Sequence, residues 1–327
     1  MKRRTLMQAG AAALVQPVWT GAALAQAAAF PNRPVRIVVP FGPGGPTDLT
    51  ARLAAEKLSA RWGQPVLVDN RPGAGGSLGS EQVARSAPDG YTLVLGVTGS
   101  HGINLSLYPK LGYHPLNDFE PLTQATAFPN AIAVHPSVPA QTLVELVRLA
   151  RARPGALSYG SDGNGTASHL GMELIKAEAR VFLVHLPYRG GAAMLNDLVG
   201  GQIEVGISGL PGALPLAKAG RIRLLAVTTP ERAAAAPEVP TVAEQGFPRY
   251  VAAPWSGFFA PKGTPKALVD KLADDLIDAL KLPDVRQRMA DVGSSIVASR
   301  PEAFRSFVQG EIERWALAVK TSGAKVD

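Results

Sequence analysis

Hydrophobic residues occur along this chain in short runs of valine, isoleucine and leucine, and segments with helical spacing separate the runs. This alternation predicts largely parallel sheets that are covered by helices on both faces. The runs predict strands at residues 35–40, 66–69, 92–97, 131–134, 182–186, 203–207, 224–228 and 257–260. We therefore expect an α/β fold.

The segments between the runs carry apolar residues three and four positions apart, which predicts amphipathic helices. These helices are expected at residues 49–61, 78–85, 143–152, 168–177, 192–199 and 214–219. The last third of the chain is mostly helical, and Pro265 and Pro301 stand where a first helical turn tolerates proline. We expect helices from there to about residue 280 and to about residue 319.

The first 25 residues have the pattern of an export signal rather than of a folded segment. Lys2-Arg3-Arg4 precedes a weakly apolar run, and Ala23-Leu24-Ala25 places small residues where a signal peptidase cleaves. We expect cleavage after Ala25 and a mature protein in the periplasm. The arginine pair also resembles a twin-arginine signal, so the sequence leaves the export route open.

Composition narrows the classes of partner. The leader holds three of the positive charges, so its removal lowers the formal net charge from +7 to +4. This mild excess suits an anionic small molecule without requiring one. No basic run alternates with aromatic residues, which argues against nucleic acid, and no later apolar segment is long enough for membrane insertion. The chain has no cysteine, which excludes disulfides, thiol catalysis and a lipid anchor on cysteine.

Two glycine-rich turns, half a chain apart, resemble each other. Pro40-Phe41-Gly42 with Gly44-Gly45 follows one predicted strand, and residues 187–191, Pro-Tyr-Arg-Gly-Gly, follow another. Before a helix, such turns let backbone N–H groups approach an anion. Neither a dinucleotide-binding nor a Walker-type spacing is present, which disfavours nucleotide phosphate and leaves carboxylate. We expect both turns to face one cleft between two lobes, although two ordinary connections would have the same composition.

A third turn, at residues 159–170, adds polar side chains. Thr166 fits a helix N-cap whose hydroxyl could hold a carboxylate oxygen, and a cap with no ligand explains it equally. His169 could donate to an anion or only satisfy the helix start. The chain lacks a nucleophile elbow and the histidine spacing of a zinc site. A secreted hydrolase using Ser100 or Ser161 is therefore the weaker alternative, and we expect no cofactor and no metal.

The ordered motifs resemble one known family. VVPFGPGGPTDLTAR, VDNRPGAGGSLGSE, APDGYTL, SYGSDGNGTASHLGMEL, LPYRGGAAMLNDLVGGQIEV, RLLAVTTPER and VPTVAEQGF occur in this order between residues 38 and 247. They are closely similar to segments of the substrate-binding receptors of tripartite tricarboxylate transporters, the Bug family. Each motif alone is weak evidence, whereas the ordered set is specific.

The resemblance implies a periplasmic-binding-protein architecture of two α/β lobes, each with a mostly parallel sheet, joined by crossover strands. Lobe 1 is expected at residues 26–129 and 253–327, with the C-terminal helices packed on it, and lobe 2 at residues 130–252. We expect hinges near residues 128–130 and 252–255. The resemblance also implies a protein that binds a small carboxylate and delivers it to membrane permease subunits. We expect this protein to be a monomer and not an enzyme. An orphan sensor with the same ligand is a further alternative.

Carried over by position, the resemblance implies a ligand site that both lobes share. Its residues in lobe 1 are Phe41, Gly42, Gly44, Gly45, Asp48, Ala74, Gly75, Ser100 and His101. Its residues in lobe 2 are Ser161, Gly165, Thr166, His169, Tyr188 and Arg189.

The sequence also bears on the class of ligand. Ser208-Gly209 stands where family members often carry an acidic residue, and the remaining acids near the site are Asp48 and Asp162. A buried ammonium group needs a carboxylate or converging carbonyls to offset its desolvation. We therefore expect an organic acid without an amino group.

Overall fold

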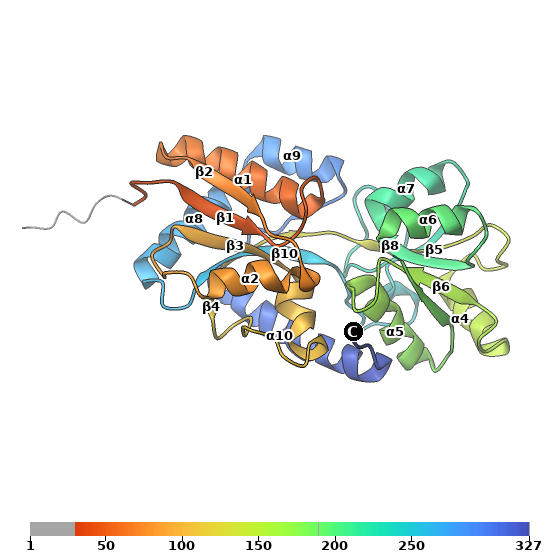
Figure 1. Ribbon diagram of the computed structural model, residues 1–327. Coiled ribbons are helices and arrows are strands. Elements are labelled where there is room, and N and C mark those ends of the chain that lie inside the picture. The colour runs from red at the N-terminus through yellow and green to blue at the C-terminus, as the bar shows by residue number, and fades with distance from the viewer. Residues whose placement is uncertain (1–29, 189, 327) are drawn as a thin grey trace, which may run out of the picture.

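The chain folds into two α/β lobes that lie side by side, each built around its own sheet (Figure 1). The computed structural model describes residues 30–188 and 190–326. The expected leader and Arg189 lie outside these residues. The α/β prediction is confirmed.

Lobe 1 contains a six-stranded sheet with the strand order β11-β4-β10-β3-β1-β2. The strands are β1 (Val35–Val39), β2 (Val66–Asn70), β3 (Thr92–Val97), β4 (Phe119–Ala127), β10 (Trp255–Pro261) and β11 (Ser295–Ile296). The helices around them are α1 (Pro46–Trp62), α2 (Ser77–Ala84), α8 (Lys266–Lys281) and α9 (Pro283–Asp291).

Both faces of this sheet are covered, as the apolar runs predict. Side chains alternate across a strand, so Ile37 of β1 packs in one apolar cluster with α1, α8 and α9, whereas the adjacent Val38 packs in another with α2. Three short elements lie near the edge that faces lobe 2, namely η1 (Ala74–Gly76), η2 (Gly99–Ile103) and α3 (Asn104–Leu107).

Lobe 2 contains a five-stranded sheet with the strand order β7-β6-β8-β5-β9. The strands are β5 (Asn130–Val134), β6 (Ser158–Ser161), β7 (Val184–Pro187), β8 (Val205–Gly209) and β9 (Arg223–Val227). The helices are α4 (Leu143–Ala152), α5 (Ala167–Ala179), α6 (Gly191–Val199) and α7 (Leu210–Lys218), and a short turn η3 (Ala243–Gln245) follows. Helices α4 and α5 cover one face of the sheet, and α6 and α7 cover the other.

Two adjacent segments connect the lobes. Strand β4 continues into β5 through Phe128 and Pro129, and Pro254 leads back into β10. The backbone N–H of Phe128 donates to the carbonyl of Pro254 at 3.0 Å. Strands β4 and β10 pair antiparallel, as do β5 and β8. Both sheets are therefore more mixed than expected, because the crossover strands run against their neighbours.

The last helix, α10 (Pro301–Ser322), contacts both lobes and not lobe 1 alone. Phe304 and Val308 belong to an apolar cluster of lobe 1, whereas Trp315 and Val319 belong to a cluster that contains α4 and α5 of lobe 2. A helix of 22 residues is about 33 Å long, which is enough to reach across.

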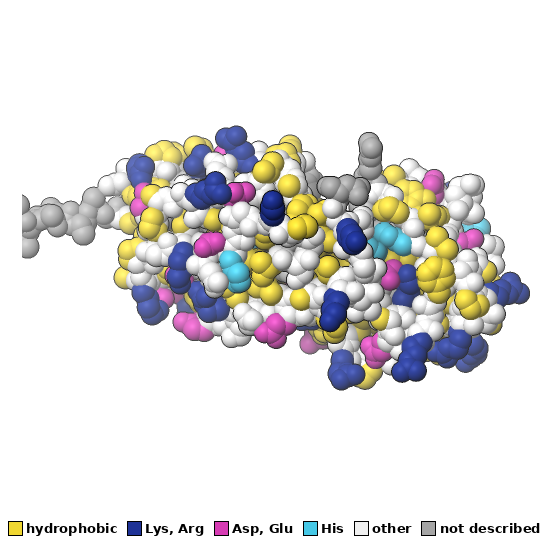
Figure 2. Space-filling view, turned by 60° about the horizontal axis from the view of Figure 1, so that its bottom comes forward, with side chains coloured by type: hydrophobic (Ala, Val, Ile, Leu, Met, Phe, Trp, Pro, Cys, Tyr) yellow, Lys and Arg dark blue, Asp and Glu magenta, His cyan; other side chains and the backbone are white. Residues whose placement is uncertain are grey.

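The surface shows no single basic field on the visible face. Lysine and arginine side chains are scattered there with acidic ones among them (Figure 2). Within residues 30–188 and 190–326, no helix has the length and apolar character needed to cross a membrane.

Candidate functional site

A cavity of about 340 Å³ lies between the lobes, next to the crossover. This volume is at the lower end of the range usual for small-molecule pockets. Lobe 1, the crossover and the start of α5 in lobe 2 all contribute to its wall. Four of the residues expected in the site line it, namely Phe41, Gly75, Gly165 and Thr166.

Helix α5 begins at the cavity with Thr166 as its N-cap. The hydroxyl of Thr166 accepts a hydrogen bond from the N–H of His169 at 3.3 Å and donates to the carbonyl of Gly163 at 2.7 Å. The first N–H groups of a helix lack partners within the helix. Those of Ala167 and Ser168, which line the cavity, have no acceptor among the described residues. Two free donors and the positive end of the helix dipole therefore face the cavity.

Gly165 brings the two lobes into contact. Its φ angle is +71°, and a Cβ atom placed on it would lie 2.3 Å from Cδ2 of Leu107 in lobe 1. Its N–H donates to Nδ1 of His169 at 3.0 Å, which fixes the turn. Only glycine combines this left-handed backbone with so close an approach.

Asp162 places a carboxyl group beside the start of α5. It lines the cavity, and its backbone N–H donates to the Ser168 hydroxyl at 3.0 Å. Its Oδ1 is buried beside Gly191 and Ser208, without a hydrogen-bond partner in the described part of the chain. Burial raises the pKa of this carboxyl, and hydrogen bonding to Ser208 and Ser168 offsets the rise only in part.

The lobe 1 wall includes the aromatic side chains of Phe41 and Tyr108. The ring of Phe41 lies against Gly76, with Cε2 3.2 Å from the position of a Cβ atom on that glycine. The hydroxyl of Tyr108 lies near Gly75, and burial raises the pKa of Tyr108. The amide of Asn104 donates to the carbonyl of Gly75 at 3.1 Å. It also donates to the hydroxyl of Ser77 at 2.9 Å, so both amide protons are used within the lobe.

Asp48 engages one N–H group of the first glycine turn. The N–H of Gly44 donates to Oδ2 of Asp48 at 3.0 Å, and Arg52 and Asn70 also donate to this carboxylate. Burial acts to raise the pKa of Asp48, but the hydrogen bonds from Arg52, Gly44 and Asn70 outweigh it and hold the pKa below its usual range. The cavity wall does not include Asp48, nor the glycines at 42, 44 and 45.

Ser100 and His101 lie in the core of lobe 1 beneath the cavity. Both are fully buried, and the Ser100 hydroxyl lies 2.9 Å from Nδ1 of His101. The imidazole stacks on Phe259, and burial lowers its pKa to about 3. These two side chains support the fold of the wall and do not line it.

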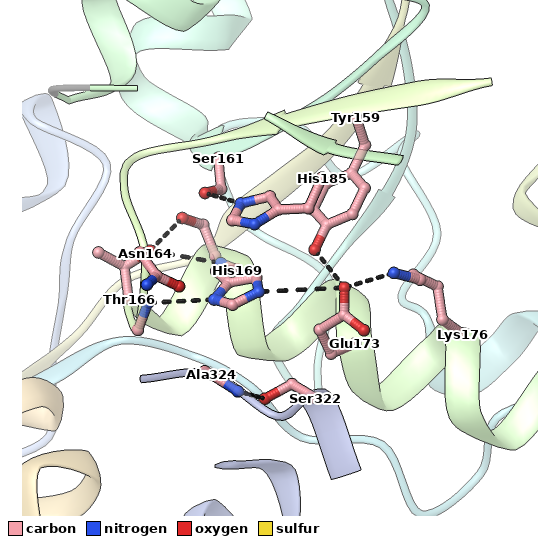
Figure 3. A network of polar contacts seen from close by, with 12 residues as sticks. Tyr159, Ser161, Asn164, Thr166, His169, Glu173, Lys176, His185, Ser322 and Ala324 are labelled. Atoms are coloured by element: carbon pink, nitrogen blue, oxygen red, sulfur yellow. Dashed lines mark hydrogen bonds and ion pairs between the residues drawn. The ribbon is translucent and has the colours of Figure 1, made fainter. Parts of the chain in front are cut away.

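A polar network lies behind the start of α5 (Figure 3). The Ser161 hydroxyl lies 2.8 Å from Nε2 of His185, whose ring stacks in parallel on His169 with centroids 3.8 Å apart. Glu173 accepts hydrogen bonds from Tyr159 and from Lys176 of α5. Burial lowers the pKa of both histidines to about 4. The rings are therefore neutral at neutral pH, and the network braces the turn that holds Gly165.

A second, more polar cavity of about 620 Å³ lies on the other side of this network. Lobe 2 and residues 321–325 at the C-terminal end of α10 line it, and Asn164 donates to the carbonyl of Lys325 at 2.6 Å. The carboxylate that borders this cavity, Glu173, is already paired with Lys176. No lobe 1 sheet or crossover residue borders it, so we assign ligand binding to the first cavity.

Two other expected site residues remain within the described part of the chain. Ala74 has a φ angle of +47° and precedes Gly75 without lining the cavity. The Tyr188 hydroxyl donates to Asp197 at 2.8 Å and also lies off the wall. The wall residues that were missed include Asn104, Leu107 and Tyr108, which belong to none of the quoted motifs, and Asp162, Ala167 and Ser168, which belong to the third turn.

Comparison with known proteins decides the family. Residues 50–324 match the tripartite tricarboxylate transporter family receptor domain. The chain belongs to this family. It is 36% identical to the protein BugT of Bordetella pertussis over 306 residues, which cover 93% of this chain and 94% of BugT.

Two solved structures of similar proteins contain carboxylates. Rpa4515 of R. palustris, solved with adipate, is 38% identical, has a TM-score of 0.78, and the match covers 90% of this chain and 99% of the other. MatC of Rhodopseudomonas palustris, solved with malate, is 35% identical, has a TM-score of 0.74, and the match covers 89% and 100%. Membership in the receptor family and the periplasmic-binding-protein fold are thereby confirmed.

Replacing Thr166 with alanine tests the α5 end of the site in this receptor. The change removes the cap and frees the Gly163 carbonyl, so affinity for a carboxylate ligand should fall by about 1–2 kcal/mol. Thr142→Ala is the matched control, because Thr142 caps α4 in the same way, accepting from the N–H of Glu145 at 3.1 Å, away from the cavity. Calorimetry should show weaker binding in Thr166→Ala alone, and equal affinity of both variants with the wild type would contradict this role.

Proposed function

We propose that this protein is a periplasmic receptor that captures a small organic carboxylate between its lobes and delivers it to a tripartite tricarboxylate-type permease. The observation that carries the proposal is the start of α5, where two free N–H groups face a cavity bordered by both lobes. Family membership and the adipate-bound and malate-bound neighbours support the same class of ligand.

We further propose that the protein is a monomer and not an enzyme. The alternative of a hydrolase needs a serine that a substrate can reach, and Ser100 and Ser161 are both fully buried. Neither serine lines the cavity. An orphan sensor would share the ligand and differ only in its partner, and neighbouring genes for two membrane subunits would favour transport.

The division at residues 129–130 and 252–253 is proposed as a hinge between two moving lobes. Ligand contacts to both lobes exist only in the closed state, so binding shifts the population toward closure. X-ray scattering of ligand-stripped protein should show a smaller radius of gyration once a carboxylate saturates it. An unchanged radius, with binding established by calorimetry, would contradict the hinged receptor.

The proposed ligand lacks an amino group. Gly44, Arg52 and Asn70 already donate hydrogen bonds to the Asp48 carboxylate, and burial disfavours the charged form of Asp162 and raises its pKa, which weakens it as a partner for an ammonium group. Matched pairs test this proposal, with succinate titrated against aspartate and glutarate against glutamate. A tenfold preference for either amino acid, about 1.4 kcal/mol, would overturn it.

Asp162 should make carboxylate affinity depend on pH. Its raised pKa means that acidification toward pH 5 protonates it sooner than an ordinary aspartate, which removes repulsion of the bound carboxylate. Affinity should therefore rise as the pH is lowered, beginning at a higher pH than an ordinary aspartate would give, while His169 and His185, with pKa values of about 4, stay largely neutral above pH 5. Titrations between pH 8 and pH 5 measure the effect.

The matching variants are Asp162→Asn and Asp270→Asn. Asp162→Asn should bind more tightly at pH 8 by about 1 kcal/mol, the scale of two unit charges a few ångströms apart in water, and its affinity should vary little with pH. Asp270 is exposed and paired with Lys266 on α8, so Asp270→Asn should behave like the wild type. A pH profile of Asp162→Asn that matches the wild type would refute the role of Asp162.

A further inference from the structure

The cavity is polar at one end and apolar at the other. The start of α5 provides the free N–H groups of Ala167 and Ser168 at the lobe 2 end. The opposite wall contains Phe41 and Tyr108 of lobe 1 and Phe128 of the crossover. A ligand that fits both ends has a charged head and an apolar body.

The aromatic end provides no cationic partner for a second negative charge, although the hydroxyl of Tyr108 lies in its wall. No lysine or arginine lines the cavity among residues 30–188 and 190–326. Both amide protons of Asn104 are used within lobe 1. The Thr98 hydroxyl exchanges hydrogen bonds with the backbone of Trp255, accepting at 2.8 Å and donating at 3.4 Å. A carboxylate placed here would lose water without gaining a charged partner, which is unfavourable.

Phe41 provides a positive reason for an aromatic body. It leaves 37% of its surface exposed at the cavity edge, although it is a large hydrophobic side chain. Covering this ring removes apolar area from water, and aromatic pairs gain further from offset or edge-to-face contact. Tyr108 and Phe128 extend the same wall, so a flat ring would contact several aromatic side chains.

We propose that the ligand is an aromatic monocarboxylate, with its carboxylate at the start of α5 and its ring against Phe41, Tyr108 and Phe128. This proposal rests on the proposed function and narrows it to one chemical class. It predicts discrimination against dicarboxylates of similar size, because their second charge falls at the apolar end.

Calorimetric titration of ligand-stripped protein tests the class. Benzoate and phenylacetate are compared with succinate and adipate at pH 7. We expect at least one aromatic monocarboxylate to bind tenfold or more tightly than either dicarboxylate. If a dicarboxylate binds equally or more tightly, the aromatic proposal fails while the carboxylate receptor stands. If none of the four binds and a sugar or an amine does, the proposed function itself fails.

A pair of alanine variants tests the position of the ring. Phe41→Ala should weaken benzoate binding about tenfold, because it removes one side of the aromatic wall. Leu78→Ala is the control, since Leu78 is 57% exposed on α2 of the same lobe and lies outside the cavity. Unchanged benzoate affinity in Phe41→Ala, or an equal loss in Leu78→Ala, would overturn the placement. Circular dichroism of both variants checks that the fold is retained.

Discussion

Replacing Gly165 with valine is expected to reduce carboxylate affinity about a hundredfold. A Cβ atom at this position would meet Cδ2 of Leu107 at 2.3 Å, and the φ angle of +71° is strained for a branched residue. Strain and overpacking of this kind cost about 2–3 kcal/mol. The clash arises where the lobes touch, so it opposes the closed state. Calorimetric titration of the variant measures the loss.

The matched control for this change is Gly220→Val. Gly220 has a φ angle of +69° after α7, and a Cβ atom there would have nothing within 4 Å. The control therefore introduces the same backbone strain without a contact between lobes, so it should lower stability but not affinity. Equal losses of affinity in both variants would show that strain, and not the approach of Leu107, is responsible.

Replacing Glu311 with alanine is expected to lower the free energy of unfolding by about 3–5 kcal/mol. Glu311 is 1% exposed, and its Oε2 accepts hydrogen bonds from the indole N–H of Trp255 at 2.7 Å and of Trp315 at 2.8 Å. Its Oε1 pairs with Arg314. The variant leaves two buried indole donors without their acceptor. Because Trp255 opens β10 and lines the cavity, this network also fixes the crossover against α10.

Urea unfolding of three variants separates the causes. Glu311→Gln keeps one acceptor oxygen, so it should lose less stability than Glu311→Ala. Glu313 lies on the exposed side of the same helix, so the free energy of unfolding of Glu313→Ala should stay within about 0.5 kcal/mol of the wild type. A loss below about 1 kcal/mol in Glu311→Ala would mean that water satisfies the indoles and that the network is not structural.

The apolar runs predicted the buried strands β1, β3, β5 and β8 and also the less buried strands β2 and β7. Residues 92–97 and 143–152 match β3 and α4 at both ends. Strand β4 was missed because Thr123 and Thr126 interrupt its apolar pattern, although the strand is buried. Both threonines find partners from distant segments, Thr126 with Ser256 at 2.7 Å and Thr123 with the carbonyl of Ser299 at 2.8 Å. Such partners cannot be read from one segment alone.

Several shorter elements escaped prediction for a similar reason. Strand β6 and helix α9 were not expected. In α9 only Val285 and Met289 are buried, which is too few apolar positions to reveal a helix before α1 and α8 are placed against it. The extension of α10 onto lobe 2 likewise depends on where the lobes meet.

The candidate site was predictable where backbone geometry is encoded by residue type. Gly165 and Thr166 stand in the motif as turn and cap, and both reach the cavity. The glycine turn of lobe 1 has equally suggestive residues, but Asp48 takes the N–H of Gly44. Ser100 has the polarity of a ligand contact and is buried in the core. A sequence shows which donors exist, whereas only the fold shows which are already used.

The cavity between the lobes is expected to select a carboxylate. Native mass spectrometry tests this selectivity most directly, with ligand-stripped protein offered an equimolar mixture of organic acids, amino acids, sugars and polyamines. We predict one adduct per chain, with the mass of an organic acid, and a sharply reduced adduct in Gly165→Val but not in Gly220→Val. An adduct with a sugar or a polyamine, in the absence of any with an acid, would show that the cavity does not select carboxylates.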